Sequence, residues 1–304
     1  MTKLKFILLA TTLLFLLTSH TYGQGCSDAG FCTINSFKPN GADSLNVMNN
    51  QFKIGAFLGA ADYDILVYGN YLEYNRQFGK KWGLDAKLVT MAQNGNGIAT
   101  FGLSDVFLNA NYNAGKSIKF TLGAKIPLSN ANKSLNNLPL PMDYQASLGT
   151  FDILFGIGYV VKKIQFVVAL QQPITQNSNQ FIASNYPTDS KLNTFQSTNK
   201  FQRSGDILLR VSYPISLSKK FKLTPSVLPI YHLANDKYTD EFNIKRDINN
   251  SSGLTLNGTL YLDYQINTKS AIQINMGVPF VVRENRPDGL TRSIIANLEY
   301  RIKF

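Results

Sequence analysis

The sequence predicts an all-β protein, a transmembrane antiparallel up-and-down β-barrel of about twelve strands. Three observations predict this fold. Apolar and polar residues alternate along many segments, short and long connections alternate between these segments, and a nearly constant spacing separates a lysine in each short turn from a later proline. The first observation indicates strands, and the other two indicate that the strands cross a membrane.

The alternation is clearest in residues 118–126, 151–159, 254–266 and 294–304. A period of two residues is the pattern of a strand with one apolar face. It also fits a soluble antiparallel sandwich, so alternation alone leaves both folds open. The expected strands are 51–60, 70–78, 84–92, 100–113, 118–128, 149–161, 164–174, 204–216, 221–233, 253–266, 271–283 and 291–304. Their number is even, as in bacterial single-chain barrels.

The connections favour a membrane barrel over a sandwich. Short turns occupy residues 79–81, 115–117, 162–163, 218–220 and 267–270. The long connections lie at about 129–148, 175–203 and 234–252. Short periplasmic turns and longer outer loops are typical of outer-membrane barrels.

The spacing from turn lysine to proline matches the length of a membrane-spanning strand. It is 11 residues from Lys116 to Pro127, 10 from Lys163 to Pro173, 9 from Lys220 to Pro229 and 10 from Lys269 to Pro279. A tilted strand crosses a bilayer in about 9–11 residues. We therefore interpret these four prolines as outer strand ends, where a missing N–H costs little. They are also candidates for kinks that open the wall sideways.

Aromatic residues mark the other end of the strands. A tyrosine shortly precedes each short turn or the last residue, at Tyr74, Tyr112, Tyr159, Tyr213, Tyr264 and Tyr300. Six tyrosines at one depth indicate half of an aromatic girdle. Phe304 follows an alternating strand and is similar to the terminal signal that the barrel-assembly machinery reads.

The first residues resemble a secretory signal peptide. Lys3 and Lys5 precede the apolar run Phe6–Leu17, and small residues before Gln24 suggest cleavage after Gly23. This run has 12 residues, whereas a membrane helix needs about 20. The expected organisation is a signal peptide at 1–23, an N-terminal segment at 24–50 and the barrel at 51–304.

The segment 24–50 contains the two cysteines, Cys26 and Cys32. In an oxidising compartment we expect them to form a small disulfide loop. Lipidation of Cys26 is the alternative. We expect no metal site, since no histidine lies nearby. The segment is either a periplasmic tail or a plug in the lumen.

The charge indicates membrane lipid as a partner. The net charge of +11 becomes +9 without Lys3 and Lys5, and eight lysines lie in the short turns: Lys80, Lys81, Lys116, Lys162, Lys163, Lys219, Lys220 and Lys269. These would ring the periplasmic rim beside anionic head groups, while the outer leaflet supplies lipopolysaccharide. Nucleic acid is not expected, because no basic patch interleaved with aromatics stands apart from the turns.

The faces opposite the apolar ones predict the side chains of the lumen: Asp85, Lys87, Asp105, Lys119, Lys125, Asp152, Arg210, Asp263, Glu299 and Arg301. Charges this frequent need water or ionic partners. A wet or plugged channel and a barrel sealed by ion pairs both satisfy them. The mixed signs argue against strong ion selectivity.

The sequence contains little that indicates an enzyme. After signal cleavage His232 would be the only histidine, and it lacks the following serine expected of a barrel phospholipase. Asp236, Asp240 and Glu241 could supply a protease-like acidic rim, but they fit a solvated loop equally well. No phosphate-binding loop, dinucleotide fingerprint, serine elbow or metal spacing occurs. We expect no catalytic residue and no cofactor.

Residues 122–128 (LGAKIPL) and 145–159 (QASLGTFDILFGIGY) resemble the outer-membrane transporters of meta-pathway phenol degradation, distant relatives of the long-chain fatty-acid channels. Leu148 and Thr150 stand where that family has more glycines, and the opening cysteine segment resembles exported proteins of Bacteroidota-like bacteria. The resemblance implies passive uptake of small, hydrophobic solutes through a plugged barrel. A non-transporting barrel that binds or anchors a secretion, gliding or adhesion complex is the alternative.

Overall fold

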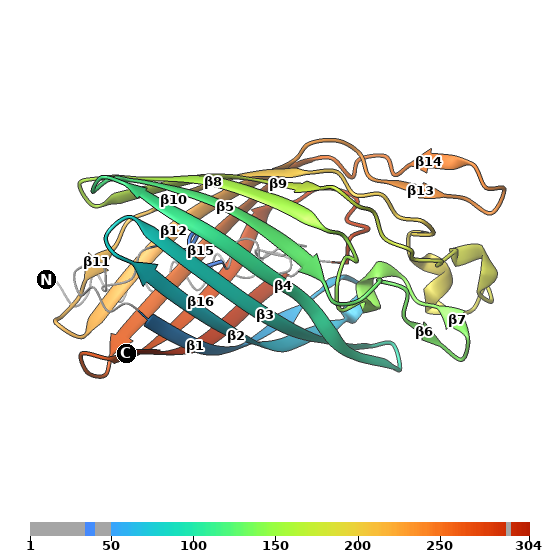
Figure 1. Ribbon diagram of the computed structural model, residues 1–304. Helices are drawn as coiled ribbons and strands as arrows, with labels where there is room; N and C mark the ends of the chain where they lie inside the picture. The colour runs from blue at the N-terminus through green and yellow to red at the C-terminus, as the bar shows by residue number, and fades with distance from the viewer. Residues whose placement is uncertain (1–33, 40–49, 290–292) are drawn as a thin grey trace, which may run out of the picture.

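The protein is a closed antiparallel β-barrel of twelve strands, and the computed structural model describes residues 34–39, 50–289 and 293–304 (Figure 1). The strands are β1 (Asn50–Ala60), β2 (Leu66–Phe78), β3 (Trp82–Gly95), β4 (Ile98–Ala114), β5 (Ile118–Pro127), β8 (Asp152–Val161), β9 (Ile164–Pro173), β10 (Asp206–Ser212) with β11 (Ile215–Ser216), β12 (Phe221–His232), β15 (Gly253–Gln265), β16 (Ser270–Val281) and β17 (Ile294–Lys303). We count β10 and β11 as one strand, interrupted at Pro214.

Every strand pairs antiparallel with its neighbours, and two pairings close the sheet on itself. Strand β1 pairs with β17 from Gln51↔Lys303 to Ala60↔Ile294, and β10 pairs with β12. The twelve-stranded barrel expected from the sequence is therefore confirmed. We call the end with the short connections the turn end and the opposite end the loop end.

The structure adds elements that alternation did not predict. Two hairpins stand in the long loops: β6–β7 (Ser134–Leu135, Leu138–Pro139) and β13–β14 (Lys237–Thr239, Lys245–Asp247). Both project from the loop end (Figure 1). Strand β2 also begins at Leu66, earlier than expected, because its ladder with β3 continues to Leu66↔Asn94.

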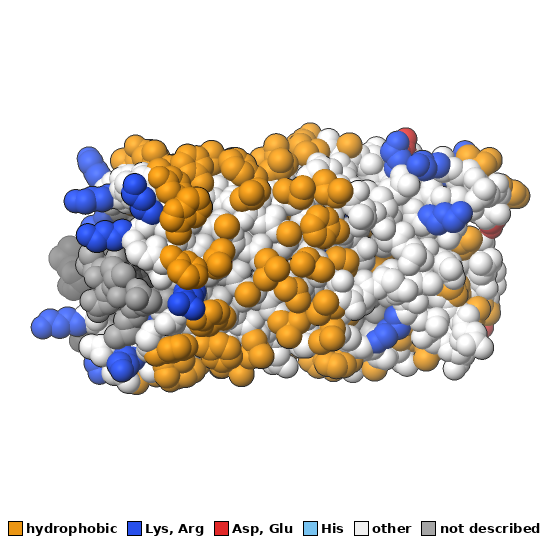
Figure 2. Space-filling view, in the orientation of Figure 1, with side chains coloured by type: hydrophobic (Ala, Val, Ile, Leu, Met, Phe, Trp, Pro, Cys, Tyr) orange, Lys and Arg blue, Asp and Glu red, His pale blue; other side chains and the backbone are white. Residues whose placement is uncertain are grey.

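The outer surface of the barrel is a broad apolar band (Figure 2). Alternate residues of each strand are exposed and apolar, as with Leu122 at 60% and Leu298 at 55% exposure. An outward apolar face opposed to an inward polar one is the arrangement of a lipid-facing barrel. No helix in the described part of the chain is long and apolar enough to span a bilayer.

The turn end carries the basic rim and an aromatic girdle. All eight turn lysines are exposed, and basic side chains gather at that end in Figure 2. Trp82 and Tyr112 contact one another on the outer face, with ring centroids 4.7 Å apart, and Phe221 lies 4.7 Å from Tyr264. Aromatic and basic side chains therefore share one level, as at a membrane interface.

The four prolines occupy different positions in their strands. Pro127 and Pro173 are the last residues of β5 and β9, as expected. Pro229 and Pro279, by contrast, lie inside β12 and β16, which continue to His232 and Val281.

The two interior prolines coincide with ladder irregularities. The β10–β12 ladder lacks pairs between Leu208↔Ile230 and Val211↔Val227, beside Pro229. A register shift leaves Phe280, next to Pro279, without a partner on β15. A missing N–H in mid-strand explains both interruptions.

A charge on the apolar band should destabilise the barrel strongly. We expect Leu122→Arg to lower the free energy of unfolding by about 2–4 kcal/mol, since an arginine near the bilayer midplane meets hydrocarbon. Urea unfolding in lipid vesicles measures the change. The control is Phe242→Arg, because Phe242 is 74% exposed in the β13–β14 connection and its replacement should have little effect. Equal losses in both variants would contradict a lipid-facing Leu122.

Candidate functional site

Residues 34–39 of the chain itself occupy part of the lumen. Residues 34–39 lie inside the barrel, and Ile34 and Phe37 are each 1% exposed (Figure 1). The Phe37 ring packs against Gly156 of β8, where a Cβ atom would lie 2.2 Å from Phe37 Cε1. A glycine in the wall therefore makes room for an aromatic side chain of the inserted segment.

Polar contacts attach this segment to one side of the wall. The Ser36 hydroxyl donates a 2.7 Å hydrogen bond to Asp85 of β3, and Lys38 Nζ lies 2.8 Å from Glu299 Oε2 of β17. Lys53 of β1 donates to Asn35 Oδ1 at 2.6 Å. Strands β3, β1 and β17 are near neighbours in the sheet, whereas β8, which carries Gly156, lies across the barrel. The polar contacts and the Phe37 contact therefore hold the segment from opposite sides.

Ion pairs within the wall surround the segment at the same level. Lys53 pairs with Glu73 on the adjacent strand at 3.1 Å, and Arg301 pairs with Asp263. The Tyr71 hydroxyl donates to Glu299 at 2.7 Å. Buried charges require such partners, and each wall carboxylate named here has one.

The middle of the lumen is apolar, which differs from the polar lumen expected from the sequence. Ile34 and Phe37 belong there to one cluster of buried apolar side chains, whose other members are Tyr71, Val89, Phe107, Leu154, Val167, Ala169, Leu208, Leu228 and Ile230. Burying apolar surface against the inserted segment is favourable. Lumen-facing positions therefore need not be polar where the lumen is filled.

A second ionic cluster lies toward the loop end, around His232. His232 Nδ1 is 2.7 Å from Asp206 Oδ1, and its Nε2 is 2.9 Å from Asp236 Oδ1. Arg203 pairs with Asp206 at 2.5 Å. The cluster joins β10 to the loop before it and β12 to the loop after it, and all four side chains are buried.

Arg283 and Asp288 extend this cluster to the loop after β16. Arg283 Nη2 lies 2.9 Å from Asp288 Oδ2, and Arg203 Nε lies 3.6 Å from the same oxygen. Burial disfavours the charged form of Asp288, but Arg283 and Arg203 outweigh it and hold the pKa of Asp288 below its usual value. Three loops are thus held by shared charges.

The position of His232 disfavours a hydrolase. Both ring nitrogens contact carboxylates, so the imidazole donates from both only when it is doubly protonated. A histidine that activates a hydroxyl needs one nitrogen as an acceptor. The ring therefore has a structural role in this arrangement, consistent with the expectation from the sequence.

A third group of polar side chains surrounds Asp152 at the start of β8. Lys125 Nζ lies 2.9 Å from Asp152 Oδ2, and the Thr150 hydroxyl donates to Asp152 Oδ1 at 2.6 Å. Asp105 nearby accepts hydrogen bonds from Ser147 at 2.7 Å and from Ser104 at 2.9 Å. This group fixes the long loop before β8 to the wall.

The long loops pack against one another at the loop end. Two loops and the strands form one apolar cluster at this end. Its loop residues are Leu140, Tyr144, Phe181, Tyr186, Leu192 and Phe195, and its strand residues include Val67 and Met91. Ala131, Met142, Leu148, Phe201 and Ile248 form a second cluster. The loops are therefore packed structures with cores of their own.

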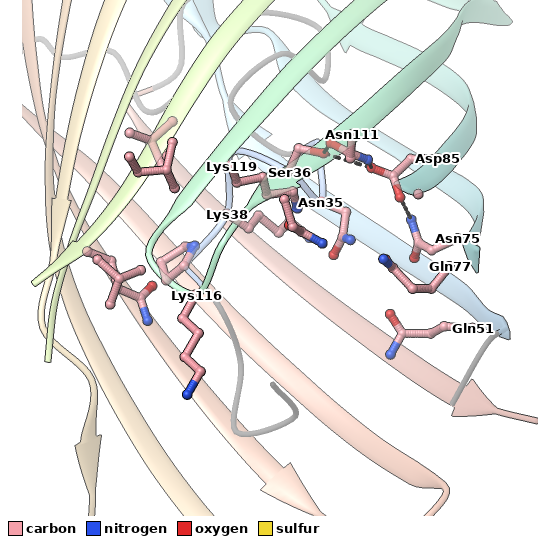
Figure 3. Close-up of a pocket in the computed structure, with 18 of the residues that line it drawn as sticks. Asn35, Ser36, Lys38, Gln51, Asn75, Gln77, Asp85, Asn111, Lys116 and Lys119 are labelled. Atoms are coloured by element: carbon pink, nitrogen blue, oxygen red, sulfur yellow. Dashed lines mark hydrogen bonds between the residues drawn. The ribbon is translucent and has the colours of Figure 1, made fainter. Parts of the chain in front are cut away.

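A cavity of about 470 Å³ lies at the turn end, below the inserted segment (Figure 3). Asn35, Ser36 and Lys38 form part of its lining, together with wall residues such as Asp85, Asn111 and Lys119. Figure 3 shows a chain of hydrogen bonds from Asn75 through Asp85 to Asn111 along one side. The cavity is predominantly polar, and the turn residues Lys80 and Lys116 border it.

The ten charged residues predicted for the lumen lie in three places. Asp85, Lys119, Glu299 and Arg301 line the cavity, with Asp263 behind Arg301. Lys87 and Arg210 are buried higher in the lumen, where their charges lie 4.3 Å from the Tyr71 ring and 5.7 Å from the Tyr261 ring. Asp105, Lys125 and Asp152 belong to the group at the start of β8. Lys119 is half-buried, and the other nine are buried.

The lumen also contains charged residues that were not predicted from the sequence. Lys53 and Glu73 lie on inward faces and pair directly across β1 and β2, so a stricter use of alternation would have identified them. Arg203, Arg283 and Asp288 lie in loops, where no period indicates the direction of a side chain. Within the described residues, no group of histidine, cysteine and acidic side chains could hold a metal ion.

Solved structures with a similar fold include an outer membrane channel from Pseudomonas putida F1, with a TM-score of 0.61 and 14% identity over 88% of this chain and 99% of that chain. The NanC porin has a TM-score of 0.45 and 11% identity, covering 84% and 98% of the two chains. The CymD monoaromatic hydrocarbon channel has a TM-score of 0.44 and 10% identity, over 94% of this chain and 98% of that chain. No family model and no curated protein matches the sequence. At 14% identity, the first similarity supports the fold alone.

Proposed function

We propose that the protein is an outer-membrane channel for the passive uptake of small molecules, hydrophobic ones included. The observation that carries the proposal is that the lumen is filled by residues 34–39 as well as by the wall. Twelve strands enclose more space than wall side chains alone fill. A segment held by a few polar contacts can leave, and the space that it vacates would connect the two ends.

The layering of the lumen supports hydrophobic solutes among those admitted. A solute would pass the polar cavity, then the apolar layer around Phe107 and Leu154, then the ionic cluster around His232. The resemblance to the meta-pathway transporters points the same way. We further propose that residues 34–39 belong to a plug formed by the segment 24–50.

Solute flux tests the proposal directly. Liposomes that contain the purified protein should admit small uncharged solutes faster than empty liposomes, and deletion of residues 24–50 should increase the rate several-fold. Planar bilayers should show discrete conductance steps that grow with the same deletion. A folded barrel that admits no solute and carries no current, with or without residues 24–50, would overturn the proposal.

The residues before the described segment carry separate proposals. The signal peptide at 1–23 and the cysteines Cys26 and Cys32 lie outside the residues that the structure describes. We propose cleavage after Gly23 and a Cys26–Cys32 disulfide. The intact mass of the exported protein, with and without reductant, distinguishes these from uncleaved and lipidated forms.

Assembly and lipid contacts complete the proposal. Phe304 is 60% exposed, and its N–H donates to Asn50 O at 3.1 Å, so its ring is available to the barrel-assembly machinery. The turn lysines would meet phospholipid head groups, and the loop end would meet lipopolysaccharide.

One observation favours the alternative of an anchoring barrel. The β13–β14 hairpin extends beyond the loop end. Its side chains Phe242 and Ile244 are 74% and 48% exposed. If these side chains bind a protein partner, deleting residues 237–247 should abolish capture of that partner and leave solute flux unchanged.

A further inference from the structure

We propose that the cavity at the turn end binds small organic carboxylates, with the Lys119 ammonium group holding the anion. This proposal rests on the channel proposed above, because it names a class of solute that the channel admits. The cavity lies at the turn end, and Asn35, Ser36 and Lys38 of the inserted segment form part of its lining.

Basic side chains outnumber acidic ones around this cavity. Its lining includes the basic residues Lys38, Lys53, Lys80, Lys116, Lys119, Arg301 and Lys303, but only Asp85 and Glu299 among the acidic residues. Arg76 also borders the cavity, but its guanidinium lies 4.9 Å from the Phe78 ring, which faces outward. Counting Glu73 and Asp263, which pair with Lys53 and Arg301, still leaves an excess of positive charge. A cleft lined by one sign of charge concentrates ions of the opposite sign.

The pairing of these charges identifies Lys119 as the anion-binding group. Lys38 is 2.8 Å from Glu299, so its charge is already compensated. Lys119, which is half-buried, makes no hydrogen bond or ion pair with any of the residues that the structure describes.

The Asp85 carboxylate, which also lines the cavity, makes its hydrogen bonds with side chains other than Lys119. Asp85 accepts three hydrogen bonds from neutral groups, each 2.7 Å long, from Ser36, Asn75 and Asn111. Its oxygens are therefore directed toward these donors. The ammonium group of Lys119 keeps its three donors for a solute.

The surroundings of Lys119 favour an anion with an apolar body. Lys119 pairs across the sheet with Gly158, which in turn pairs with Val167 of the apolar layer. An added Cβ at Gly158 would find its nearest atom, Lys119 Cβ, at 3.7 Å, so space adjoins the lysine. Val160 also borders the cavity. A charged head beside Lys119 and an apolar body toward Val167 would satisfy both surfaces, which an inorganic anion would not.

Benzoate and its uncharged isostere benzamide are suitable probes. We expect calorimetric titration of the full-length protein in micelles to show benzoate binding, with benzamide binding much more weakly. Lys119→Gln should weaken benzoate binding about tenfold, the usual effect of losing one charge-assisted hydrogen bond. Lys119→Arg should restore it, which shows that the fold tolerates a change at this position. The matched control is Lys219→Gln, because Lys219 is a turn lysine outside the cavity lining.

The same variants in planar bilayers separate this inference from the proposed function. In a sodium benzoate gradient, the reversal potential of the wild type should indicate a preference for the anion, and Lys119→Gln should shift it toward zero. Equal binding of benzoate and benzamide, or unchanged binding in Lys119→Gln, would overturn the carboxylate site even if the protein conducts. Benzoate binding that depends on Lys119, in a protein that does not conduct, would overturn the proposed channel function but would support the carboxylate site.

Discussion

Replacing Gly156 by valine is expected to expel residues 34–39 from the lumen and raise the single-channel conductance several-fold. Any Cβ at this position would stand 2.2 Å from Phe37 Cε1 and 2.9 Å from its Cζ, far inside contact distance. Valine suits a strand, so the wall itself should accept the change. The ring of Phe37 would then have to leave the apolar layer. Planar-bilayer recordings measure the result.

The matched control lies on the same face of the same strand. Gly158→Val adds a side chain whose nearest neighbour, Lys119 Cβ, is at 3.7 Å, and it should not increase the conductance. Combining Gly156→Val with Phe37→Ala removes the clashing ring and should return the conductance toward the wild-type value, since the two changes act on one contact. Equal increases for Gly156→Val and Gly158→Val would show that the inserted segment does not limit the current.

The second large effect is expected at Asp206. Asp206→Asn keeps the shape of the side chain but removes the charge that balances Arg203 and His232, both of which are buried. Removing one partner of a buried ion pair costs about 3–5 kcal/mol, because the remaining charge is left without compensation. We expect the free energy of unfolding to fall by that order.

Urea unfolding monitored by fluorescence can measure this loss. Trp82 is the only tryptophan and lies on the outer face of β3, 56% exposed, so its emission reports contact with the lipid or micelle. The control is Asp247→Asn in the pair Lys237–Asp247, whose side chains are 48% and 54% exposed. An exposed pair contributes about 0–1 kcal/mol. Similar losses in both variants would mean that the cluster around His232 does not stabilise the barrel.

The wall of this protein could be read from the sequence because each strand repeats one simple rule. Alternation places a side chain toward lipid or toward the lumen, and the turn lysines mark where each crossing starts. Both signals are local, so twelve crossings and the exposed positions of residues such as Leu122 and Tyr159 followed without knowledge of the pairing. Strand ends were less certain where prolines occur, since Pro229 interrupts one ladder while its strand continues.

What fills the lumen was decided only in three dimensions. Alternation indicates that a side chain points inward, but the partner that it meets comes from a strand or loop distant in the sequence. Glu299 meets Lys38, and His232 meets Asp206, through contacts that closure of the barrel creates. Gly156 likewise matters because the Phe37 ring, distant in sequence, occupies the space that a Cβ atom would need.

The sequence by itself determined the barrel, its lipid-facing band and its basic turn end, because these depend on local periodicity and on the thickness of a bilayer. The tertiary structure decided that residues 34–39 enter the lumen, that its middle is apolar and that Lys119 forms no ion pair within the described part of the chain. Each of these depends on pairwise contacts across a closed sheet, and no local pattern encodes them.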